Sequence, residues 1–81
     1  MTSKTLNLVQ PFERQGKRLV AGRLMDFKTP EEATGRAERD ARRFIGVVAV
    51  QQSVDTETGE VLEEPVILAR YGELPLEFAE A

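Results

Sequence analysis

The chain of 81 residues contains neither histidine nor cysteine. Histidine is the commonest general base and metal ligand near neutral pH, while cysteine supplies thiol nucleophiles, disulfides and the ligands of zinc and iron–sulfur sites. The serines, Ser3 and Ser53, therefore have no histidine to activate them. From this inventory we expect no catalytic residues, no cofactor and no metal site, and so a protein that is not an enzyme.

Other signals are also missing. The glycines are too scattered for a phosphate-binding loop, and the low aromatic content of 6% disfavours a platform for stacking nucleic-acid bases. We find no charged-then-apolar leader and no apolar run long enough to span a membrane. These features predict a cytoplasmic protein without a membrane partner.

The acidic segment around Gly59 has two readings. Asp55, Glu57 and Glu60 offer oxygen atoms like those that bind calcium, but their spacing is not that of an EF-hand loop. The same residues fit a hairpin in which Gly59 takes a left-handed conformation. We therefore predict a turn here rather than a metal site.

The length of the chain limits the size of its core. A domain of this size buries only about 60% of the surface that its unfolded chain exposes, so its stability is marginal without reinforcement. No disulfide can supply that reinforcement, and association with a partner is the remaining common device. We predict a single domain over residues 1–81, with residues 1–5 and 76–81 frayed or extended.

One helix is strongly signalled after residue 28. Thr29 is a good N-cap, Pro30 suits the first helical position and Glu32 completes a capping box. Gly46 is expected to end the helix in a left-handed conformation. The predicted helix buries a stripe spaced by three and four residues, made of Ala33, Ala37, Ala41 and Phe44.

Four strands are expected around this helix. Apolar alternation and β-branched residues predict strands near residues 6–12, 17–27, 47–54 and 66–71. Pro11 cannot donate a hydrogen bond to a neighbouring strand, which places the first strand at an edge. The predicted fold is α+β, of order ββαββ, with a four-stranded, mainly antiparallel sheet and one helix packed on one face.

The third and fourth strands are apolar on both sides, whereas one helix covers only one face of a sheet. A second copy of the chain would cover the other face, which predicts a homodimer; an unidentified protein partner is the alternative occupant. The function expected is that of a non-catalytic interaction or structural module. Its predicted interface residues are Val48, Val50, Ile67 and Tyr71 of the strands and Leu74, Leu76 and Phe78 of the tail.

Nucleic-acid binding is the alternative function. Charge is unevenly placed: residues 1–50 carry a net charge of +4 and residues 51–81 a net charge of −7. Arginines follow one flank of the predicted helix and could track phosphates, although interleaved acidic residues favour a solvated, ion-paired face. The residues predicted for this role are Arg36, Arg39 and Arg43, with Arg14, Lys17 and Arg18 from the first turn.

Several segments carry a family resemblance between residues 29 and 75. The motifs are TPEEA, AERDARRF, GVVAV, TGE and PVILARYGELP. In this arrangement the chain resembles small uncharacterised bacterial proteins that share a helix followed by an acidic-turn hairpin. The resemblance implies a bacterial origin and brings no assigned activity or site residue.

Overall fold

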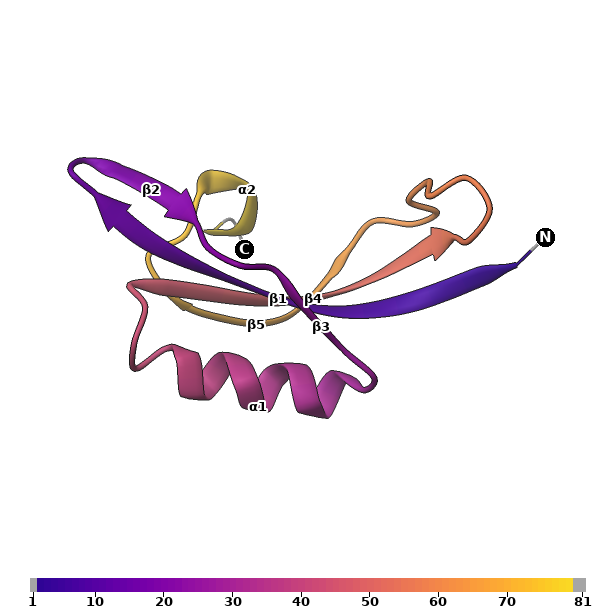
Figure 1. The fold of residues 1–81 in the computed structure, drawn as a ribbon, viewed down its shortest axis with the longest axis horizontal. Helices are drawn as coiled ribbons and strands as arrows, with labels where there is room; N and C mark the ends of the chain where they lie inside the picture. Colours follow the sequence, from indigo (N-terminus) through magenta and orange to yellow (C-terminus); the bar gives the residue numbers. More distant parts are fainter. Residues whose placement is uncertain (1, 80–81) are drawn as a thin grey trace.

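The computed structural model describes residues 2–79, which form one antiparallel sheet with a helix on each face (Figure 1). The strand order is β2-β1-β4-β5, and β3 pairs with the same edge of β1 as β2. This confirms the α+β class, with five strands in place of four. The elements are β1 (Ser3–Gln15), β2 (Arg18–Ala21), β3 (Met25–Phe27), α1 (Pro30–Asp40), β4 (Gly46–Asp55), β5 (Val66–Gly72) and α2 (Leu76–Ala79).

The prediction that Pro11 places the first strand at an edge is wrong. β1 is central, with β4 on one side and β2 and β3 on the other. The Pro11 carbonyl accepts a 2.8 Å hydrogen bond from the Gly22 N–H, but proline has no N–H to return one. The side-chain amide of Gln10 donates to the Gly22 carbonyl instead, at 2.8 Å. A neighbouring side chain thus completes the pairing that the proline cannot make.

Helix α1 begins as predicted and ends earlier than predicted. The Thr29 hydroxyl accepts a 3.1 Å hydrogen bond from the Glu32 N–H, as an N-cap should. The helix ends at Asp40, and Gly46 begins β4 instead of closing the helix. A side chain at Gly46 would place its Cβ only 1.7 Å from the Glu73 carbonyl oxygen, so the glycine serves a close approach between two backbone segments.

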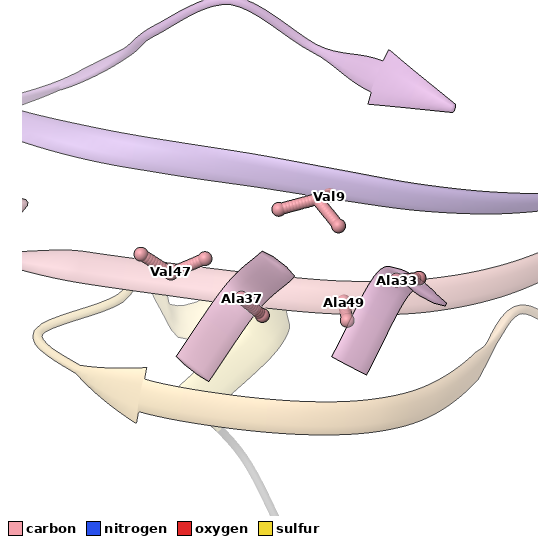
Figure 2. Close-up of a cluster of buried hydrophobic side chains, with 5 residues drawn as sticks. All are labelled: Val9, Ala33, Ala37, Val47 and Ala49. Carbon is pink, nitrogen blue, oxygen red and sulfur yellow. The ribbon is translucent and has the colours of Figure 1, made fainter. Parts of the chain in front are cut away.

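The main core lies between α1 and the sheet. Ala33 and Ala37 are fully buried, and the small alanine side chains let the helix lie close to the strands (Figure 2). Phe44, predicted to belong to the buried stripe of the helix, is only partly buried and follows the end of α1. The buried cluster consists of Val9, Ala33, Ala37, Val47 and Ala49, with Met25, Phe27, Phe44, Leu68, Ala69 and Tyr71 packed around it.

Regular elements reach close to both ends of the described residues. Residues 3–5 belong to β1, where Ser3 pairs with Asp55 and Thr5 with Ser53 of β4. Residues 76–79 form α2 rather than an extended tail, and residues 1, 80 and 81 lie outside the described range.

Candidate interaction surface

The sheet face opposite α1, here called the open face, carries a second apolar cluster. It is built by alternate residues of the two central strands, Leu8 and Phe12 from β1 and Val48 and Val50 from β4. Leu8 lies directly opposite Val50, and residues two or four apart along a strand point to the same side of the sheet. The sequence therefore produces two apolar faces, as its patterning predicted.

Part of the open face is covered by the segment that follows β5. Leu74 and Phe78 pack against the second cluster, and the Phe78 ring lies 6.1 Å from the Phe12 ring at a tilt of 47°. The Glu73 N–H donates a 2.9 Å hydrogen bond to the Ile45 carbonyl, which fixes the start of this segment against β4. Leu76, by contrast, is 85% exposed.

An apolar groove of about 490 Å³ remains on the open face beside α2. Its floor is the central pair of strands, and Leu24, which is 54% exposed, forms part of its rim. Two glutamines are the polar groups of the lining. The groove is lined by Leu8, Gln10, Phe12, Ala21, Leu24, Val48, Val50, Gln52, Pro65 and Phe78.

The strand residues predicted for the interface lie on different faces of the sheet and differ in exposure. Val48 and Val50 lie on the open face but are already buried within the chain. Ile67 lies opposite Val50 and is 37% exposed. Tyr71 lies opposite Val47 and packs in the core beneath α1, so its placement on the same face as Val48 was wrong.

A bulge in β5 is the reason for this separation. Ala49 pairs with Ala69, whereas the next residue, Val50, pairs with Ile67, so Leu68 has no opposite partner on β4. One extra residue in a strand reverses the side to which the residues beyond it point. Ile67 and Tyr71 would share a face in a regular strand, and here they do not.

A similar irregularity separates β2 from β3. Phe12 pairs with Ala21, but Val9 pairs with Met25, so residues 22–24 contain one residue more than regular pairing would allow. Ala21 and Leu24 both line the groove, while Met25 lies beneath α1. Regular alternation along a strand of residues 17–27 would place Met25 on the same face as Ala21. Leu24 was not among the predicted interface residues.

Two charged arms flank the open face. The turn between β1 and β2 and the loop after β4 rise on the side of the sheet that carries α2, at opposite ends of the long axis (Figure 1). The first, here called the basic arm, spans residues 14–18 and contains Arg14, Lys17 and Arg18. The second, the acidic arm, spans residues 55–64 and contains Asp55, Glu57, Glu60, Glu63 and Glu64, with no basic residue.

The turn chemistry of the acidic arm is as predicted. The Asp55 carboxylate accepts a 2.7 Å hydrogen bond from the Glu57 N–H, and Gly59 has a φ of 79°. Within the described residues, no group of three or more acidic side chains is arranged to hold a metal ion.

The arginines proposed for nucleic-acid contact form two separate groups. Arg36 binds Asp40 through its Nε at 3.0 Å, and Arg14 forms an ion pair with Glu73. Arg39 and Arg43 are exposed near the end of α1, and the Arg43 guanidinium lies 5.8 Å from the centre of the Phe44 ring. The basic arm lies at the same end of the molecule as these arginines but on the other side of the sheet (Figure 1).

Comparison of the chain with protein-family models, curated proteins and solved structures found no match. The likeness to small bacterial proteins therefore stays a prediction. Neither described helix has the length and apolar character needed to cross a bilayer.

Proposed function

We propose that the chain is a non-catalytic, cytoplasmic interaction module that acts as a homodimer through its open face. The observation that carries this proposal is the apolar groove beside α2, which residues 2–79 leave uncovered. Exposed apolar surface bordered by polar groups is a feature of protein interaction sites. The lack of histidine and cysteine supports a role without chemistry.

A second copy is favoured as the occupant because the domain needs reinforcement. The buried cluster beneath α1 consists of three alanines and two valines, and each alanine buries little area. Burial contributes roughly 25 cal/mol per Å² of apolar surface, so covering the groove would add substantially to a small core. Association with another copy supplies that burial without any additional chain.

The test compares two charge insertions at similarly exposed positions. Leu24 lines the groove and is 54% exposed, and Val66 is 56% exposed. Val66 pairs with Gln51, and Gln51 points away from the open face because its neighbour Val50 points towards it. Val66 therefore lies on the opposite side of the sheet. We expect Leu24→Glu to yield monomers and Val66→Glu to leave the dimer intact, because only the first puts a charge into the interface.

Light scattering coupled to size exclusion, together with native mass spectrometry, measures the subunit number of each variant. A wild-type chain that stays monomeric at every concentration up to the solubility limit would refute the proposal. Equal weakening by both substitutions would show that the contact lies elsewhere.

Polyanion binding is the second candidate, favoured by the gathering of basic residues at one end of the molecule. Arg39, Arg43, Lys17 and Arg18 are exposed there. Phosphate contacts would make binding to duplex DNA fall steeply with added salt. Fluorescence anisotropy with a labelled duplex tests this, and the absence of binding at low salt would remove the candidate.

A further inference from the structure

We propose that the second copy sits on the open face with its long axis reversed, so that the basic arm of each subunit meets the acidic arm of its partner. This inference rests on the proposed dimer and adds its symmetry and the contacts that select it. Three features of the fold support it: the charges of the arms, the off-centre position of α2, and the dimensions of the face.

The two arms cannot neutralise each other within one subunit. They lie at opposite ends of a molecule whose longest dimension is 44 Å (Figure 1). Charges in solution are screened over about 8 Å at physiological ionic strength. The four exposed glutamates of the acidic arm, Glu57, Glu60, Glu63 and Glu64, and the exposed Lys17 and Arg18 of the basic arm are therefore available to a second molecule.

Symmetry then limits the ways in which two open faces can meet. A two-fold axis that relates facing surfaces lies in the plane between them. An axis along the long dimension places basic arm on basic arm and acidic arm on acidic arm, which is repulsive at both ends. An axis across the long dimension creates two identical attractive contacts, and charge complementarity of this kind selects orientation.

The position of α2 favours the same arrangement. α2 covers the half of the open face nearer the basic arm and leaves the half nearer the acidic arm uncovered (Figure 1). In the reversed dimer each α2, which carries the 85% exposed Leu76, lies over the uncovered half of its partner. With the two-fold axis along the long dimension, the two α2 helices would meet each other, and neither would cover the uncovered half of the partner's face.

The face is large enough for a stable contact. The molecule measures 44 Å along its long axis and 23 Å across it, and these lengths are the upper limit for the face. A stable interface buries roughly 800 Å² on each partner, which a face of these dimensions can supply.

A charge-swap experiment tests the arrangement. One variant carries Lys17→Glu and Arg18→Glu, and the other carries Glu63→Lys and Glu64→Lys; all four positions are exposed. Each variant alone would pair like charges at both ends, so we expect its dimer dissociation constant to rise at least tenfold at low salt. In an equimolar mixture both contacts become attractive, and we expect a heterodimer to form with close to wild-type affinity.

A matched control distinguishes the effect of the charges in the arms from the effect of the net charge of the whole protein. Arg39→Glu with Arg42→Glu changes the net charge by the same amount as the first variant, at exposed positions near the end of α1 on the other side of the sheet. We expect this control to dimerise like the wild type. Native mass spectrometry distinguishes all species because the variants differ in mass.

The outcomes separate this inference from the proposed function. A wild-type dimer whose affinity is unchanged by either arm variant would overturn the reversed arrangement while leaving the dimer in place. Failure of the mixed variants to form a heterodimer would also overturn it, and so would mixtures that form trimers and longer chains, which indicate head-to-tail contact. A monomeric wild type would refute the dimer itself.

Discussion

Replacing Gly46 by alanine tests the packing of the segment that covers the open face. The new Cβ would lie 1.7 Å from the Glu73 carbonyl oxygen and 2.7 Å from its carbonyl carbon. Both obstructing atoms belong to the backbone, so no side-chain rotation can relieve the contact. We expect the segment that begins at Glu73 to move away from β4 by more than an ångström.

The cost of this movement follows from the contacts that it disrupts. The hydrogen bond from the Glu73 N–H to the Ile45 carbonyl is lost, at about 1 kcal/mol. Leu74 and Phe78 then lose part of their packing on the open face, where loss of a whole large apolar side chain costs about 3–5 kcal/mol. We expect Gly46→Ala to lower the free energy of unfolding by about 2–4 kcal/mol, a decrease of more than roughly 10 °C in Tm.

Gly35→Ala is the matched control, since the residue sits inside α1 and a Cβ added there would meet no atom within 4 Å beyond its own stretch of helix. Alanine is favoured over glycine in a helix by about 1 kcal/mol, so this variant should be more stable than the wild type. Urea unfolding at one fixed protein concentration measures both variants, and amide hydrogen exchange at Glu73 reports the local opening. Equal stability of Gly46→Ala and the wild type, with the Glu73 amide still protected, would refute the reasoning.

Three further substitutions test individual contacts by urea unfolding. Thr29→Ala removes the N-cap of α1 and should cost about 1 kcal/mol; an unchanged midpoint would mean that the cap contributes nothing. Gln10→Leu deprives the Gly22 carbonyl of the donor that replaces the missing proline N–H, and a loss of about 1 kcal/mol is expected. Arg36→Ala leaves the buried Asp40 carboxylate without its partner and should cost about 1–2 kcal/mol, because Arg36 itself is partly exposed. Adding Asp40→Asn should recover most of that loss, and a further decrease would contradict the ion-pair account.

The features that could be predicted from the sequence are those with a local cause. The start of α1 depends on Thr29 and the residues within one turn of it, and all of them are adjacent in the chain. The turn at Gly59 likewise follows from its own residues. The end of α1 could not be read in this way, because Gly46 is required by the approach of Glu73, which is distant in sequence.

Pro11 shows a second limit of sequence reasoning. The rule that proline marks an edge strand assumes that no other donor can replace the missing N–H. In this fold Gln10 reaches across to the Gly22 carbonyl, and β1 becomes central. Gln10 can replace the missing donor because the strand beside β1 is interrupted at residues 22–24, between β2 and β3. The alternation of apolar and polar residues does not reveal this interruption.

The two bulges explain how the core beneath α1 is filled although the helix contributes mainly alanines to it. Ala33 and Ala37 let α1 lie close to the sheet but bury little area, so the larger side chains of that core must come from the strands. The bulge between β2 and β3 turns Met25 and Phe27 towards α1. The bulge in β5 turns Ile67 to the open face while Leu68 stays beneath α1. With regular alternation Met25 and Phe27 would lie on the face of Ala21, which only a helix of four residues covers. The same irregularities that complete the core beneath α1 therefore decide which side chains remain on the open face.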